Sequence, residues 1–107
     1  MSPARCAAQP GYVGSYSMDA MALALHCVWT THSAADAILL AANHRGDADS
    51  TAAVTGQLAG AIYGAAALPA PWRDAVQRWD GGGGIALRAL HLRRRTLPAA
   101  MAAAAAA

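Results

Sequence analysis

An acidic turn that leads straight into a glycine-spaced helix is the feature that most restricts how this chain can fold. The segment Asn43–Gly64 reads NHRGDADSTAAVTGQLAGAIYG, and its alanine-rich part favours a helix. Gly56, Gly60 and Gly64 recur at every fourth residue, so they form one bare stripe along that helix. A bare stripe allows another backbone to approach closely. We therefore expect this helix in the middle of a helical bundle.

The turn before the helix is rich in hard oxygen donors. Asp47, Asp49, Ser50 and Thr51 stand within five positions, and carboxylate and hydroxyl oxygens are the ligands that Mg²⁺, Mn²⁺ or Ca²⁺ select. The helix dipole at the same end would also suit a phosphate-bearing ligand. An alternative remains open, in which Asp49 or Ser50 simply caps the helix. The residues alone predict either a metal site or a plain helix start.

The rest of the chain also has helical patterns, and no segment shows the sustained alternation that indicates a strand. We expect an all-α fold. Further helices are predicted at residues 18–29, at Ser33–Ala42 with an S-x-x-D start, at a segment with Pro71 in its first turn that carries Trp72, Val76 and Trp79, and at Ile85–Arg93. In the first of these, Met21, Leu25 and Val28 share one face.

Alanine accounts for 31 of the 107 residues, although 56% of the chain is hydrophobic. Alanine forms helices readily but buries little area, so a core of alanine and glycine depends on close packing of backbones. A formal net charge of +2, with one short basic cluster at Arg93–Arg95, argues against a nucleic-acid partner. The two cysteines are too few for a disulfide framework.

The sequence favours a cytoplasmic protein with no membrane partner. Met1–Pro10 lacks the basic flank and apolar stretch of a signal peptide. Ala52–Leu68 is apolar and close to the shortest length that spans a bilayer, but Thr55 and Gln57 interrupt it, so we disfavour a membrane-spanning helix. By composition, a leader at 1–10 and a basic, alanine-rich tail at 93–107 stand apart from the rest of the chain.

Three segments of the sequence resemble parts of a known protein family. GDADSTAAVTGQLAGAIYG resembles the C-terminal signature of the ADP-ribosylglycohydrolase family, which includes the dinitrogenase reductase-activating glycohydrolase. GSYSMDAMALALHCVW at Gly14–Trp29 is similar to the helix that precedes this signature, and PAPWRDAVQRWD at Pro69–Asp80 with IALRAL at Ile85–Leu90 resembles the closing helices. The resemblance covers about residues 11–92 and implies the C-terminal portion of that all-helical fold.

The resemblance also implies a function. Members hold a pair of Mg²⁺ or Mn²⁺ ions and hydrolyse the bond that joins ADP-ribose to a protein side chain or a small molecule. Carried over by position, the ligands would be Asp47, Asp49 and the Ser50 hydroxyl, with Thr51 as a further ligand or a cap. A loop made of Gly14, Ser15 and Tyr16, together with Gly46, would line the substrate pocket. For Tyr16, packing in the core is the alternative.

The chain departs from the family in two ways. Arg45 stands where a second glycine is common, and it would either crowd the site or bind a phosphate. Family members are also much longer, and their N-terminal part brings a further acidic cluster that Met1–Tyr12 does not offer. The remaining ligands are therefore expected from a missing N-terminal segment or a second chain. The alternative is a non-catalytic remnant that binds ADP-ribose or serves as a structural piece.

Overall fold

The protein is described by a computed structural model that covers residues 12–14 and 16–96. Within this part every regular element is a helix, which confirms the expected all-α fold. The elements are α2 (Ser17–Thr30), α3 (Ala34–Ala42), α4 (Ala48–Tyr63), a 3₁₀ turn η1 (Ala65–Ala67), α5 (Ala70–Trp79) and α6 (Gly84–Thr96). The predicted leader and residues 97–107 of the predicted tail lie outside the described residues.

The chain forms two compact units that divide between Pro69 and Ala70. The first unit contains α2, α3, α4 and η1, and the second contains α5 and α6. The division falls inside the region 11–92 that the family resemblance covers. Among the described residues, no helix is both long and apolar enough to cross a membrane.

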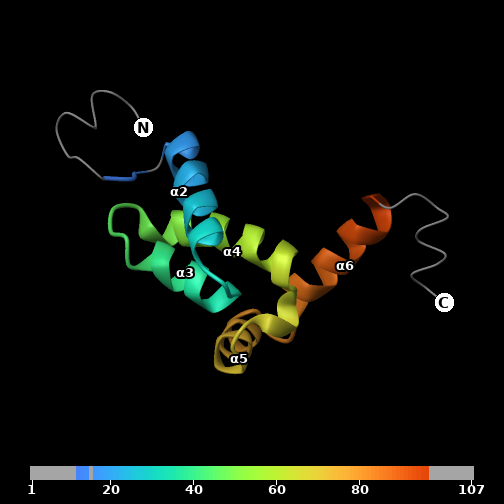
Figure 1. Ribbon diagram of the computed structural model, residues 1–107. Helices are drawn as coiled ribbons and strands as arrows, with labels where there is room; N and C mark the ends of the chain where they lie inside the picture. Colours follow the sequence, from blue (N-terminus) through green and yellow to red (C-terminus); the bar gives the residue numbers. More distant parts are fainter. Residues whose placement is uncertain (1–11, 15, 97–107) are drawn as a thin grey trace. The chain divides into compact units, whose positions relative to one another are not determined.

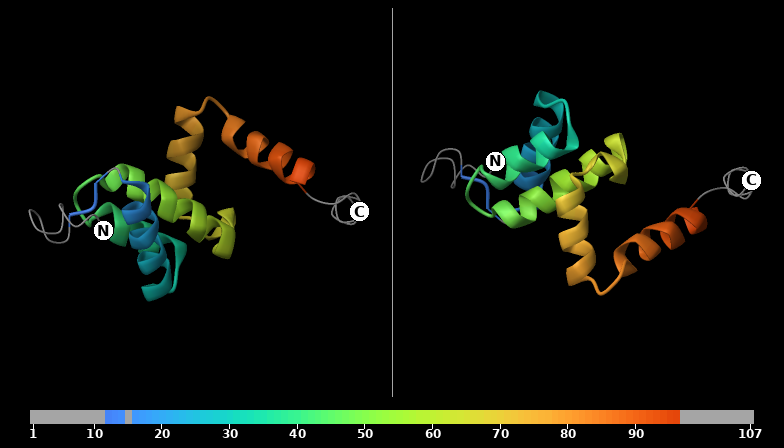
Figure 2. Two further views of the ribbon diagram at one scale, coloured as in Figure 1. Left: turned by 90° about the horizontal axis from the view of Figure 1, so that it is seen from above. Right: turned by 90° about the horizontal axis from the view of Figure 1, so that it is seen from below.

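Three helices pack against one another in the first unit. α3 and α4 run antiparallel and are joined by the loop at residues 43–47, while α2 crosses α4 (Figure 1). Each of the three contacts the other two, and Figure 2 shows the same group from above and below. Each helix therefore has two helical neighbours, and the central position expected for α4 stays a prediction.

Alanine forms most of the core, as the composition predicts. Among the described residues, the buried hydrophobic side chains are Val13, Ala20, Ala24, Cys27, Ala34, Ala37, Ala41 and Ala59. Half-buried Val28, Tyr63 and Leu68 pack against the part of this core made by α3 and α4. Small side chains at helix contacts leave little apolar area to bury, so the three helices depend on close approach.

The glycine stripe of α4 does not make the close approach that its spacing predicts. A Cβ added at Gly56 would lie 3.9 Å from the Ile38 side chain, and nothing described lies within 4 Å at Gly60. The buried face of α4 is instead formed by Thr51, Thr55 and Ala59. This face can enter the core because each threonine hydroxyl donates a hydrogen bond to the main-chain carbonyl four residues earlier. The buried hydroxyl therefore has a hydrogen-bond partner. The prediction of a glycine interface is wrong for the first unit.

The second unit has no buried residues on either helix. Pro71 lies in the first turn of α5, as the sequence predicts. Gly81, two residues after the end of α5, has a positive φ of 72°. The N–H of Gly82 donates a hydrogen bond to the Gln77 carbonyl, and the two features together form a common motif at helix C-termini. The Asp80 carboxylate then accepts a hydrogen bond from the N–H of Ile85 at 2.7 Å. The glycine run is therefore an ordered turn between α5 and α6.

Candidate metal and substrate site

A long-range hydrogen bond brings the two predicted parts of the site together. The N–H of Asp47 donates to the carbonyl oxygen of Val13 at 2.9 Å, which attaches the acidic turn to the segment that leads into α2. Beside it, the Tyr12 ring lies 3.3 Å from the position that a Cβ at Gly46 would take. The resemblance places substrate-binding residues on both segments. The structure makes these segments neighbours within the first unit.

Two consecutive residues with left-handed backbones shape the acidic turn. Arg45 has φ 75° and Gly46 has φ 70°, and Arg45 is the only described residue other than glycine with a positive φ. Before them, Asn43 ends α3 by donating from its main-chain N–H and its side-chain amide to the Leu39 carbonyl. Glycine adopts the left-handed conformation at little cost, so the backbone at position 45 suits the glycine that the resemblance leads us to expect there.

The Asp47 carboxylate is not used to cap the helix. α4 begins at Ala48 with Asp47 as its N-cap, and the Asp47 side chain makes no capping hydrogen bond. The expectation that Asp49 or Ser50 is the cap is therefore wrong. Asp49 is exposed on the first turn, and its Oδ1 accepts from the N–H of Ser50 at 2.9 Å. The plain helix-cap alternative does not account for the Asp47 side chain.

The two carboxyl groups lie beside each other. Hydrogen bonding to the Asp47 side chain, and then to the N–H of Ser50, holds the pKa of Asp49 below its ordinary value. A carboxylate that stays ionised at neutral pH is suited to bind a divalent cation. A divalent cation between the two carboxyl groups would take the place of the hydrogen bond that now joins them.

The two hydroxyl residues differ in their surroundings. Ser50 is exposed on the first turn of α4, whereas Thr51 is buried, and its Oγ1 donates to the Asp47 carbonyl at 3.0 Å. A hydroxyl that donates one hydrogen bond keeps its lone pairs as acceptors, but Thr51 is 1% exposed on the buried face of α4, so Ser50 has the more accessible oxygen. Ligation by either residue stays a prediction.

The predicted substrate loop is partly described. Gly14 is buried and Tyr16 is exposed as the N-cap of α2, so the Tyr16 ring is not a core residue of the first unit. Ser15 lies outside the described residues. Gly46 stands at the contact with Val13 described above.

Sequence reasoning missed two residues near this loop. Tyr12 is an exposed aromatic beside Gly46, and no local pattern in the sequence marks it. Asp19 is a buried carboxyl in the first turn of α2, at 3% exposure. The sequence did contain a signal for Asp19, because an aspartate inside an otherwise apolar helix is rarely buried without a role.

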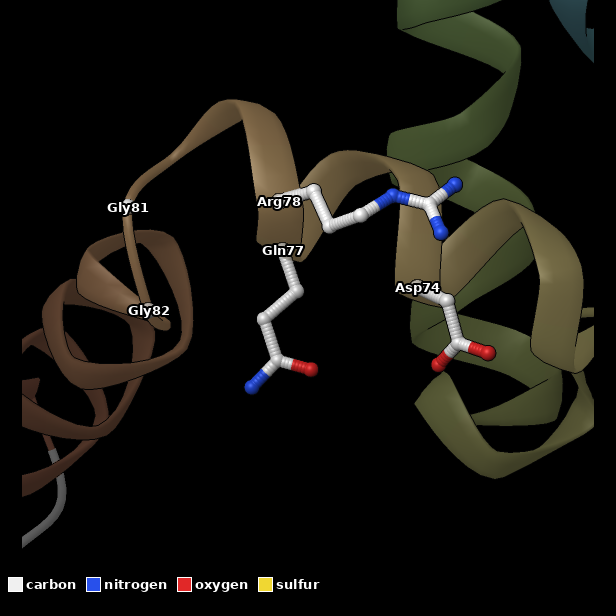
Figure 3. A pocket seen from close by; sticks show the side chains of 5 residues that line it. All are labelled: Asp74, Gln77, Arg78, Gly81 and Gly82. Carbon is white, nitrogen blue, oxygen red and sulfur yellow. The ribbon is translucent and has the colours of Figure 1, made fainter.

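The described residues show no complete set of metal ligands. No group of three histidine, cysteine or acidic side chains gathers closely enough within residues 12–14 and 16–96 to hold an ion. A shallow pocket of about 470 Å³ lies in the second unit, lined by Asp74, Gln77, Arg78, Gly81 and Gly82 (Figure 3). It contains none of the predicted site residues. The acidic turn with its Val13 contact is therefore the candidate site.

Comparisons with known proteins agree with the resemblance. Residues 2–105 match the model of the ADP-ribosylglycohydrolase family. The chain is 54% identical over 59 residues to the ADP-ribosylarginine hydrolase Tri1 of Serratia proteamaculans, and 51% identical over 61 residues to the protein of the same name from Pseudomonas putida. It is 37% identical over 62 residues to the ADP-ribosyl-(dinitrogen reductase) glycohydrolase of Rhodospirillum rubrum.

These matches cover 55%, 57% and 58% of the chain. They cover only 16% of the Serratia and Pseudomonas proteins and 21% of the Rhodospirillum protein. The chain therefore spans a small part of the length of its curated relatives. No solved structure matches it.

Proposed function

Because the chain belongs to the ADP-ribosylglycohydrolase family, we propose that it supplies the acidic half of a metal-dependent site that removes ADP-ribose from modified side chains. The observation that carries this proposal is the state of the Asp47 carboxylate. It lies beside Asp49 at the start of α4, and no capping hydrogen bond occupies it. A pair of carboxylates held in this way is suited to bind a cation.

The donor set fits a hard divalent cation. Asp47 and Asp49 would provide charged oxygens, and Ser50 and Thr51 would add neutral ones, which are the ligand types that Mg²⁺ and Mn²⁺ accept. Such an ion would supply Lewis acidity and a fixed position for substrate hydroxyls. The first unit supplies the rigidity, because the Asp47 main chain is held both by Val13 and by the first turn of α4.

The neighbouring aromatic rings support a place for the substrate. Tyr12 and Tyr16 are both exposed, and both flank the segment whose Val13 carbonyl holds the acidic turn. An exposed ring can stack on a base or a ribose face. We propose arginine-linked ADP-ribose as the first substrate to test, since two of the relatives are named ADP-ribosylarginine hydrolases.

One observation favours a second candidate function. Among the described residues, no third acidic, histidine or cysteine side chain completes the group around Asp47 and Asp49. A divalent cation held by two carboxylates and hydroxyls keeps several waters and binds weakly. The chain by itself would then bind ADP-ribose without hydrolysing it, as a non-catalytic piece that completes its site with another segment or chain.

Isothermal titration calorimetry of the purified chain tests the proposal. Mn²⁺ would be titrated with and without ADP-ribose, into the native protein and into the double variant Asp47→Asn with Asp49→Asn. We expect heat from the native protein that the double variant loses, because the amide removes the negative charge while keeping the shape. The matched control is Asp74→Asn, an exposed aspartate of the second unit. Equal Mn²⁺ binding by the native protein and the double variant would contradict the proposal.

A further inference from the structure

Helix α2 has one side that is covered within the first unit. Ala20, Ala24 and Cys27 are buried on this side, where α2 packs against α3 and α4. Their small size lets the three helices approach one another closely. This inner side is enough to account for the place of α2 in the three-helix group.

The opposite side of α2 carries large apolar side chains that no other described part of the first unit covers. Met18, Met21, Leu25 and Trp29 follow one another at spacings of three, four and four residues, and we call them the outer stripe. Their side chains are 64%, 43%, 54% and 89% exposed. A helix that is apolar on all sides is normally buried, and this spacing is typical of a stripe that packs on another helix. The outer stripe therefore has the pattern of a second packing face.

The length of the relatives indicates what covers this face. The 59 residues that match the Serratia hydrolase are 16% of that protein, so most of its chain lies outside the match. The family fold is all-helical, in agreement with the helices described here. An apolar helix from the unmatched part is thus the occupant that the comparison offers for the outer stripe.

The position of α2 connects this face to the candidate site. The helix begins four residues after Val13, whose carbonyl oxygen holds the N–H of Asp47. The N-terminal end of α2 therefore lies close to the acidic turn in space. A helix that packs on that end of α2 would be near enough to bring the further ligands that Asp47 and Asp49 lack among the described residues.

We propose that the outer stripe of α2 is the docking surface for an apolar helix from the part of the ADP-ribosylglycohydrolase fold that this chain does not match. That helix belongs to the same polypeptide as the matched segment, as it does in the Serratia hydrolase. The inference rests on membership of the family and on the exposed stripe, and it requires no turnover. It is therefore separate from the proposed activity.

A chimera provides the test. Residues 12–69 of this chain would replace the matched segment of the full-length Serratia hydrolase, and thermal unfolding would be followed for the chimera and for the present chain alone. Leu25→Glu places a charge in the outer stripe. His26→Glu is the matched control, because it is the next residue of the same helix and is also exposed. Light scattering of the present chain would report its oligomeric state.

We expect Leu25→Glu to lower the Tm of the chimera by about 5 °C or more, since a charge buried in an apolar contact is costly. We expect His26→Glu to leave that Tm nearly unchanged, and neither substitution to affect the present chain alone. Equal Tm values for the two chimera variants would overturn the proposal, and so would a native chimera that does not fold.

Two further results would assign the stripe to another occupant and also overturn the proposal. An equal loss of stability from Leu25→Glu in the present chain alone would mean that its own segments cover the stripe. A dimer of the present chain that Leu25→Glu dissociates would mean that a second copy covers it. A chimera that shows the expected Tm difference but hydrolyses no ADP-ribosylarginine would support the docking surface and contradict the proposed activity.

Discussion

Gly46 lies against the main chain of Val13 so closely that a Cβ at position 46 would overlap the Val13 carbonyl oxygen. The same oxygen accepts the hydrogen bond from the N–H of Asp47. The close contact at Gly46 and the hydrogen bond of Asp47 therefore both depend on the position of the Val13 carbonyl group. The orientation of the acidic turn relative to α2 follows from that contact.

Substitution of Gly46 by alanine is expected to be strongly destabilising. The new Cβ would displace the Val13 carbonyl, and alanine also disfavours the φ of 70° at this position. Together these effects should lower the free energy of unfolding by about 3 kcal/mol. Urea denaturation followed by circular dichroism measures the change.

Gly60→Ala is the matched control for that experiment. Gly60 lies inside α4, and nothing described lies within 4 Å of its added Cβ. Alanine is the better helix former, so this variant should gain up to about 1 kcal/mol. A loss of stability at Gly60 similar to that at Gly46 would show that the contact with Val13 is not what makes Gly46 necessary.

How much of this arrangement could be predicted differs from residue to residue. The helices were predictable because turn residues mark their ends, as at Ser33 and Pro71. The buried side of α2 was not, because a helix that is apolar all round has no periodicity to indicate which side packs inward. The structure buries Ala20, Ala24 and Cys27 there, whereas Met21 and Leu25 remain exposed.

The candidate site shows the same limit. The acidic residues were visible in the sequence because Asp47 and Asp49 are separated by one residue, and the resemblance to the family gave them roles. The hydrogen bond between Asp47 and Val13 joins segments that are far apart in the chain, and no local pattern encodes it. The cap of α4 was misjudged by two or three residues because Asp47, Asp49 and Ser50 all have N-cap preference, and only the backbone geometry decides among them.

Replacement of Arg45 by glycine is expected to stabilise the chain. Arg45 has φ 75°, a backbone conformation in which the Cβ atom lies too close to the neighbouring carbonyl oxygen. Glycine has no Cβ and avoids this strain. After allowance for the greater freedom of glycine in the unfolded chain, the gain should be about 0.5 to 1 kcal/mol. Thermal unfolding of Arg45→Gly and Arg45→Ala would be compared, since alanine keeps the Cβ and should gain nothing. Equal effects of the two variants would mean that the backbone at position 45 is not strained.

Loss of the Ser33 hydroxyl should weaken α3. Its Oγ accepts a hydrogen bond from the N–H of Asp36 at 3.1 Å, which confirms the predicted S-x-x-D start. Ser33→Ala should lower the free energy of unfolding by about 1 kcal/mol in urea denaturation. Ser17→Ala is the control, because Ser17 is an exposed first residue of α2 and makes no cap. A cost at Ser17 as large as at Ser33 would contradict the capping role.

Cys27 should react slowly with thiol reagents in the folded chain, and it should make the stability of the chain fall at alkaline pH. Burial raises the pKa of Cys27, so the folded chain keeps its proton where the thiol of the unfolded chain ionises. The contribution of this group to stability is therefore complete below the ordinary thiol pKa of about 8.5 and declines as the pH rises above it. In a Cys6→Ser background, a thiol reagent at pH 8 should modify Cys27 slowly in buffer and rapidly in urea. The stability of that protein should also fall more steeply above pH 8.5 than that of the same protein with Cys27→Ala. Rapid modification in buffer, together with identical pH profiles, would show that Cys27 is accessible and that the inner side of α2 is open to solvent.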